Sequence, residues 1–160
     1  MSSEKNLILA FDPGRDKTGF ALVNFDGGLI FSGMFPSRER EKFFDMLLNE
    51  KSIEEFIIEK FDGAGKNFLS RIKFIAIGNG THSKEFYGSA KNKFPFEIKL
   101  TDEKNTTLEA RELYWKIHRP GFFMRLLPEG LRVPARVLDD FAAWAIALRE
   151  LNKNQTAKTI

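Results

Sequence analysis

The chain has 160 residues, of which 42% are hydrophobic and 29% charged, and its formal net charge is +3. This balance excludes an intrinsically disordered chain and predicts one domain, with an ordered core over residues 5–151 and a frayed tail over residues 152–160. The lack of cysteine excludes disulfide scaffolds, thiol catalysis and Cys-based zinc sites, and two histidines exclude His-rich metal clusters. No apolar stretch approaches the roughly 18 residues of a membrane span, and residues 1–5 lack the apolar segment of a secretory signal. We therefore expect a cytoplasmic protein with no membrane partner.

Three strands are expected in the first 35 residues. The apolar run over residues 6–11 is too short for a helix and is followed by Asp-Pro-Gly, which predicts a buried strand. Residues 17–24 and 29–35 predict two more strands, because the Asp-Gly-Gly sequence between them is typical of a hairpin turn. The short connections favour an antiparallel meander.

Helices and strands alternate in the rest of the chain. Apolar periodicity predicts helices over residues 38–49, 52–60, 83–93, 106–118 and 137–151, and strands over residues 72–77 and 96–101. Residues 119–135 contain three prolines and two glycines and predict an irregular segment. The two later strands follow helices, so right-handed crossovers should place them parallel to the first strand. The predicted fold is α/β, a five-stranded mixed sheet with helices on both faces.

Acidic residues fall at the ends of three predicted elements. Asp12 ends the first strand, Asp102 and Glu103 follow the fifth, and Asp139 and Asp140 begin the last helix. The carboxyl edge of such a sheet is where ligands usually bind, so we expect these groups to lie together. Carboxylates without His or Cys suit Mg²⁺ or Mn²⁺, and such ions support hydrolysis of a phosphodiester.

Each acid also has a simpler structural interpretation. Asp12 begins an Asp-Pro-Gly sequence that is common in turns, and Asp102 could be the N-cap of the next helix. Asp139 and Asp140 could cap the last helix and complement its dipole. Three acidic regions at one predicted edge favour a shared site over three unrelated roles.

Two loops with glycine lie near the same predicted edge. Residues 12–19 offer Arg15 and Lys17 to a phosphate, and residues 78–81 follow a strand and open a helix, which predicts an anion cradle. Neither loop has the spacing of a Walker A motif. Glycine required only for a tight turn is the alternative for the second loop.

Positive charge is concentrated between residues 104 and 136, where seven Lys or Arg face three acids, a formal charge of +4. The aromatic residues Tyr114, Trp115, Phe122 and Phe123 lie among them. Basic residues beside aromatic ones are typical of proteins that bind a nucleic-acid backbone and stack on bases. The alternative is that the aromatic rings are core residues covered by arginine stems.

Four segments stand out along the chain, from about Leu7 to Leu151: the run LAFDPGRDKTGFALV, the loop IGNGTHS, the segment DEKNTTLEAR and the segment LDDFAAWAI. In this order they resemble the YqgF/RuvX family. The resemblance implies an RNase H-like fold similar to that of RuvC Holliday-junction resolvases. It also implies a nuclease that processes pre-16S rRNA, or one that resolves DNA junctions.

The resemblance also suggests roles for individual residues. Asp12 matches the aspartate of the first strand that holds metal, and Glu103 matches the second acid. Either Asp139 or Asp140 matches the acid of the last helix. Lys104 stands where the family commonly has arginine, which changes the geometry of phosphate contacts. Residues 114–136 are longer than the compact family's connection and resemble a variant branch.

We therefore predict an endonuclease that depends on Mg²⁺ or Mn²⁺ and cleaves structured RNA or branched DNA. Its predicted catalytic and metal-binding residues are Asp12, Glu103, Asp139 and Asp140. Its predicted nucleic-acid contacts are Arg15, Lys17, Lys104, Thr106, Thr107, Arg111, Arg119, Arg125, Arg132 and Arg136. Thr106 and Thr107 are included because they match the family's Thr-Thr pair. The protein is expected as a monomer or a homodimer, because junction resolution needs two cuts.

Two other functions share some of these features. A non-catalytic module could keep the acids and bind structured nucleic acid without cutting it. An actin-like ATPase also has an Asp-x-Gly sequence at its first strand, but two such halves need far more than 160 residues.

Overall fold

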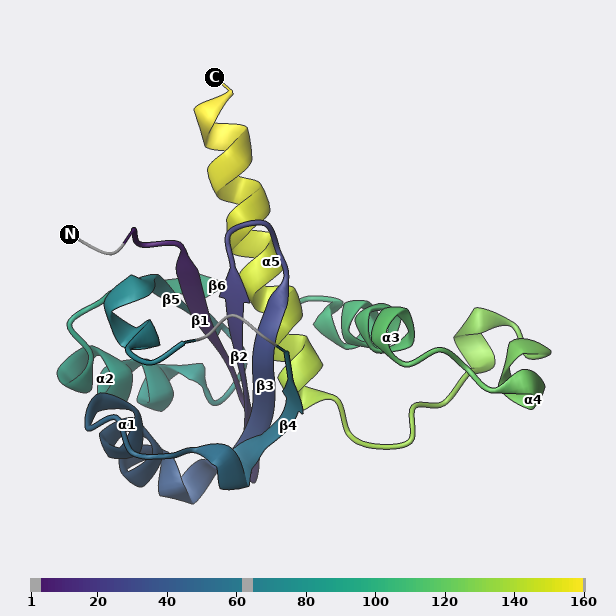
Figure 1. Cartoon of the computed structure of the whole chain (residues 1–160), viewed down its shortest axis with the longest axis horizontal. Helices are drawn as coiled ribbons and strands as arrows, with labels where there is room; N and C mark the ends of the chain where they lie inside the picture. Colours follow the sequence, from purple (N-terminus) through teal and green to yellow (C-terminus); the bar gives the residue numbers. More distant parts are fainter. Residues whose placement is uncertain (1–3, 62–64, 160) are drawn as a thin grey trace.

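The computed structural model describes residues 4–61 and 65–159. A single mixed sheet of six strands, in the order β4-β3-β2-β1-β5-β6, lies at its centre (Figure 1). The strands are β1 (Leu7–Pro13), β2 (Lys17–Asn24), β3 (Leu29–Pro36), β4 (Ile57–Lys60), β5 (Ile72–Gly78) and β6 (Glu97–Thr101). Strands β1 to β4 pair antiparallel, whereas β5 pairs parallel with β1 and β6 parallel with β5. The predicted α/β class and the meander are confirmed.

The number of strands differs from the prediction of five. Residues 52–60, expected to be helical, form a short 3-10 turn at Glu54–Phe56 and then strand β4, which pairs with β3. Burial alternates along β4, as in a strand with one covered face. A short segment with two isoleucines fits either structure locally, and the unpaired edge of β3 supplies backbone partners that favour the strand.

Helices cover both faces of the sheet, as predicted (Figure 1). On one face, α1 (Arg40–Leu48) and α2 (Ser83–Lys93) pack over a phenylalanine-rich core that includes Phe11, Phe20 and Phe43. The other face carries α5 (Asp139–Lys158) and α3 (Thr106–Ile117). Because both faces are covered, β1 is apolar at successive positions, which explains its unbroken apolar run.

Small side chains let α5 approach the sheet closely. Alanines of β1, β2 and β5 share a core with Phe141, Ile146 and several alanines of the helix. Helix α5 begins at Asp139 and continues to Lys158, through the segment that was expected to fray (Figure 1). Residues 152–158 contain no Gly or Pro, so the helix propagates beyond the sheet. In the described ranges, no helix combines the length and apolar character that crossing a membrane requires.

The segment between α3 and α5 leaves the body of the molecule. It is irregular, as predicted, except for a four-residue helix α4 (Phe122–Arg125) and a 3-10 turn at Glu129–Leu131. Figure 1 shows this segment extending away from the sheet, with α4 near its far end. We call residues 119–137 the arm.

Candidate active site

Three carboxylates from distant parts of the sequence lie at one edge of the sheet. Asp12 is the penultimate residue of β1, Glu103 follows β6, and Asp139 is the first residue of α5. Burial, together with the negative charges of Glu103 and Asp139, raises the pKa of Asp12 from 3.8 to about 7. The charges of Glu103 and Asp139 therefore act on Asp12 from the same edge of the sheet.

The chemistry of this group fits a hard divalent cation. All its donors are carboxylate oxygens, which Mg²⁺ and Mn²⁺ prefer. The raised pKa of Asp12 reflects the cost of crowding like charges, a cost that a cation would offset. Among the described residues, no three side chains of His, Cys, Asp or Glu are arranged closely enough to hold a metal ion as they lie.

The side chain of Glu103 packs against the glycine-containing loop that follows β5. A Cβ added to Gly80 would collide with Oε1 of Glu103, and one added to Gly78 would lie 2.8 Å from Oε2. The amide of Glu103 also donates a hydrogen bond to Oδ1 of Asn79, at 3.3 Å. The loop predicted as an anion cradle is thus occupied by one of the protein's own carboxylates, and its glycines provide the space.

Arg149 of α5 holds the backbone on either side of Glu103. Its Nη1 donates to the carbonyl of Asp102 at 2.6 Å, and its Nη2 donates to the carbonyl of Lys104. An ion pair of 2.6 Å with Glu109 orients the guanidinium. Sequence reasoning missed Arg149, although an arginine within the apolar stretch of the last helix is a usable signal.

The backbone at the start of α5 lies in close contact with Gly19 of β2. A Cβ added to Gly19 would collide with the carbonyl of Asp139 and lie 2.7 Å from the amide of Asp140. Only glycine allows the helix to begin this close to the sheet. Burial and the charge of Asp140 raise the pKa of Asp139, and the charge of Lys17 opposes the rise. Lys17 therefore lies beside the acidic group.

Asp140 belongs to a different environment from Asp139. Its carboxylate is fully buried and accepts hydrogen bonds from Oγ of Ser32 at 2.6 Å and from Nη1 of Arg136 at 2.7 Å. Adjacent residues of a helix point about 100° apart, so the two aspartates cannot serve the same site equally. Asp139 is the acid of this pair that acts on Asp12.

The buried pair extends to the edge strand β4. Nη2 of Arg136 lies 3.0 Å from Oε1 of Glu59, and Nε2 of His118 lies 2.7 Å from the same oxygen. Arg136 is near the end of the arm and His118 immediately precedes it, so Glu59 ties both ends of the arm to the sheet. We call Glu59, His118, Arg136 and Asp140 the clasp. Sequence reasoning found no partner for His118 and did not single out Glu59.

A cavity of about 270 Å³ lies beside the acids. Asp12 and Asp139 line it together with Thr107 and Arg111 of α3 and the end of the arm. It thus combines two carboxylates with an exposed guanidinium, a combination suited to a phosphodiester and its counter-ion.

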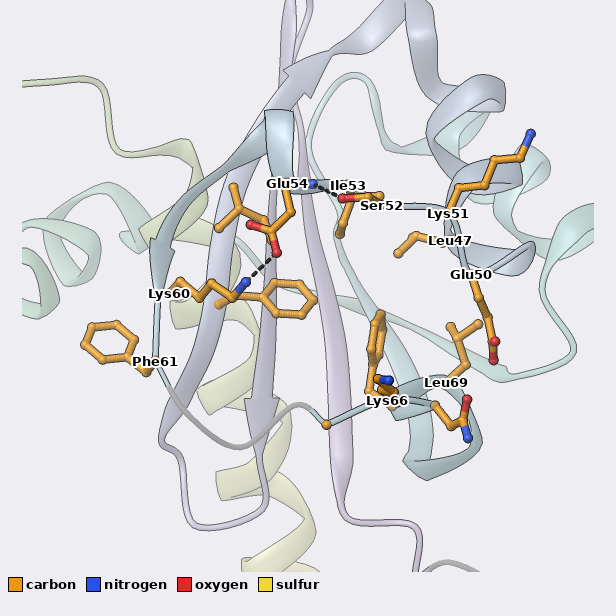
Figure 2. Close-up of a pocket in the computed structure, with 15 residues that line it drawn as sticks. Leu47, Glu50, Lys51, Ser52, Ile53, Glu54, Lys60, Phe61, Lys66 and Leu69 are labelled. Carbon is orange, nitrogen blue, oxygen red and sulfur yellow. Dashed lines mark hydrogen bonds and ion pairs between the residues drawn. The ribbon is translucent and has the colours of Figure 1, made fainter.

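A larger cavity of about 620 Å³ lies elsewhere, between α1, β4 and the 3-10 turn Phe68–Arg71 (Figure 2). Figure 2 shows Glu54 paired with Lys60 at its side. None of the predicted site residues lines this cavity. The smaller cavity is therefore the candidate site.

The predicted nucleic-acid contacts fall into two groups. Those with exposed side chains and no ion pair to a described carboxylate are Arg15, Lys17, Lys104, Arg111 and Arg119, and Thr107 is also exposed. Thr106 is buried and donates its hydroxyl to the carbonyl of Glu103 at 2.8 Å, so it shapes the start of α3 instead. Arg136 is committed to the clasp. Arg125 and Arg132 are exposed or half-buried and donate to backbone carbonyls within the arm.

No protein-family model and no curated protein sequence matches the chain. Among solved structures, it is similar to T. thermophilus RuvC in complex with a Holliday junction substrate. The TM-score is 0.53 at 13% identity, over 94% of this chain and 96% of RuvC.

Two proteins of the ROK family also match parts of the chain. One is a transcriptional regulator homologous to E. coli MLC, with a TM-score of 0.38 at 15% identity, over 68% of this chain and 30% of the regulator. The other is a Streptomyces griseus glucokinase, with a TM-score of 0.39 at 11% identity, over 66% of this chain and 36% of the kinase. The likeness to RuvC over nearly the whole chain supports the RNase H-like fold, and membership of the YqgF/RuvX family stays a prediction.

Proposed function

We propose that the chain is a metal-dependent nuclease that cleaves structured nucleic acid. The observation that carries this proposal is that Asp12 and Asp139 line one cavity with Arg111, at an edge of the sheet where the charge of Glu103 also acts on Asp12. These three acids would hold Mg²⁺ or Mn²⁺, which supplies an activated water and steadies the leaving oxygen of a phosphodiester.

The protein's own cations would position the substrate. Arg111 lines the cavity, and Lys17 lies near Asp139. Lys104 is exposed next to Glu103. Phosphate contacts of this kind orient a backbone without reading its sequence. The proposed substrate is therefore defined by structure, not by base sequence.

Two candidate substrates are supported, one by the structural similarity and one by the sequence resemblance. Similarity to RuvC, whose solved complex contains a Holliday junction, supports a four-way DNA junction. The sequence resemblance to the YqgF/RuvX family supports pre-16S rRNA. Both belong in the same assay.

The test is cleavage of a labelled four-way junction, a linear duplex and a pre-16S rRNA fragment in Mg²⁺, Mn²⁺ or EDTA. Asp12→Asn, Glu103→Gln and Asp139→Asn should each lower cleavage by more than the roughly 10- to 100-fold that loss of an outer-shell partner costs. Asp102→Asn is the matched control, because Asp102 is an exposed acid next to Glu103 whose Oδ1 accepts from the amide of Lys104, as Asn can. Wild-type rates in Asp12→Asn would refute the proposal.

A non-catalytic binding module is the second candidate. The observation in its favour is that, among the described residues, no group of three His, Cys, Asp or Glu side chains is positioned to hold a metal ion. Tight binding of either substrate without cleavage in Mg²⁺ or Mn²⁺ would favour it over the nuclease.

A further inference from the structure

The arm carries large apolar side chains into solvent. Phe123 is 82% exposed, Phe122 73% and Leu126 70%, and Leu131, Val133 and Val137 are each more than half exposed. Figure 1 shows that the arm stands away from the sheet. An exposed apolar group of this size usually marks a binding surface.

The arm is held together by arginine-to-carbonyl hydrogen bonds. Nε of Arg132 donates to the carbonyls of Met124 at 3.2 Å and Leu127 at 3.1 Å, and Nε of Arg125 donates to that of Pro120 at 3.0 Å. The clasp fixes both ends of the arm to β4 and α5. The exposed apolar side chains are thus presented by a preorganised segment, which lowers the entropy cost of binding.

The charge of the arm favours a polyanion as its partner. The arm contains four arginines and one glutamate, a formal charge of +3 that equals the charge of the whole chain. Arg119, Arg125 and Arg132 make no ion pair with any carboxylate in residues 4–61 and 65–159. A second copy of the chain would bring an arm of the same charge, which opposes self-association through this surface.

The position of the arm links it to the candidate active site. Val133 and Val137 line the same cavity as Asp12 and Asp139. A nucleic-acid strand with a phosphodiester at the carboxylates would therefore meet the end of the arm that joins α5, and its continuation could follow the arm toward α4.

We propose that the arm is a wedge that inserts Phe122 and Phe123 between bases of the bound nucleic acid, at a distance along the arm from the phosphodiester held in the cavity. This inference rests on the proposed function and adds that the substrate has bases that can be unstacked, as at a branch point. The two rings lie edge to face, 5.6 Å apart, at the exposed side of α4. Proteins that combine arginines with inserted Phe or Leu side chains separate base steps in this way.

The experiment uses a four-way junction with 2-aminopurine at the branch point, in EDTA so that cleavage does not interfere. Wild-type protein should raise the fluorescence as the base unstacks. Phe122→Ala/Phe123→Ala should abolish the rise and weaken the Kd by roughly 5- to 150-fold, the worth of one stacked base. The slope of log Kd against log salt should not change, because no cation is removed. Phe25→Ala, at a 38% exposed phenylalanine outside the arm, is the control and should behave as wild type.

The outcomes separate the wedge from the nuclease proposal. A junction that binds with no change in fluorescence would overturn the wedge and leave the proposed function standing. Failure of the wild type to bind any nucleic acid would overturn both. Sedimentation that shows a wild-type dimer and a monomeric Phe122→Ala/Phe123→Ala variant would overturn the wedge, because the arm would then be a self-association surface.

Discussion

Asp139 and Asp140 are neighbours in sequence, and the structure predicts opposite effects when each is neutralised. Asp140 is fully buried and accepts hydrogen bonds from Ser32 and Arg136, so its charge stabilises the fold. Asp139 has a raised pKa, caused by burial and by the charge of Asp140, so its ionised form is unfavourable in the folded protein. Asp140→Asn should therefore destabilise the protein, whereas Asp139→Asn should leave its stability equal or higher at neutral pH.

The magnitude for Asp140→Asn follows from the surroundings of Arg136. Removal of one partner from a buried ion pair costs about 3 to 5 kcal/mol. The side chain of Arg136 is 24% exposed and keeps its ion pair with Glu59, and an asparagine can still accept from Ser32. We therefore expect the lower end, about 3 kcal/mol, which corresponds to a fall in Tm of about 6 to 12 °C for a domain of this size.

Urea unfolding at pH 7 measures both variants, and junction cleavage is measured on the same samples. Asp139→Asn should lose cleavage while remaining as stable as the wild type, and Asp140→Asn should retain cleavage at a temperature where it is folded. Ser32→Ala is the control for the loss of one hydrogen bond to Asp140, with an expected cost of about 1 kcal/mol. A cost below about 1 kcal/mol for Asp140→Asn, as for an exposed ion pair, would refute the assignment of Asp140 to the clasp.

Two further predictions concern the loop that contacts the Glu103 side chain and the charge of Asp12. Gly80→Ala should displace the Glu103 carboxylate and lower cleavage without unfolding the protein, while Gly88→Ala, where an added Cβ meets nothing within 4 Å, should cleave as the wild type does. If Gly80→Ala cleaves normally, Glu103 is not held by this loop. Between pH 3.8 and about 7 the folded protein binds more protons at Asp12 than the unfolded chain, so metal-free stability should fall as pH rises through this window. The fall is on the order of 4 kcal/mol, should be absent in Asp12→Asn, and should be reversed by Mg²⁺ at pH 7.5; identical pH profiles for wild type and variant would contradict it.

Local sequence was sufficient to predict most of the sheet. The apolar run before Asp12 and the Asp-Gly-Gly turn determine β1 and the first hairpin, because burial on both faces and a tight turn leave short-range signals. Strand β4 was missed because its four residues carry too short a pattern to distinguish strand from helix. Its conformation depends on pairing with β3, a contact between segments about 25 residues apart.

The grouping of acids could be predicted only in outline. The sequence places Asp12, Glu103 and Asp139 at the ends of elements, but the separation of Asp139 from Asp140 depends on the rotation of α5 about its axis. That rotation depends on contacts distant in sequence, among them the close approach of the helix start to Gly19, about 120 residues earlier in the chain. The role of Gly80 is similarly non-local, because its neighbour is the side chain of Glu103. A glycine in a loop indicates that another group lies close to the backbone there, but the local sequence does not identify that group.

The clasp connects the stability of the fold with the geometry of the proposed site. Glu59 of the edge strand contacts both His118 and Arg136, and Arg136 contacts Asp140, whose neighbour Asp139 belongs to the acidic group. The arm and the first turn of α5 are therefore fixed to the sheet by the same ion pairs. A nuclease that separates bases and cuts the same strand, as proposed here, would need a constant distance between these two actions. The ion pairs around the buried Asp140 and the half-buried Glu59 would provide that constancy.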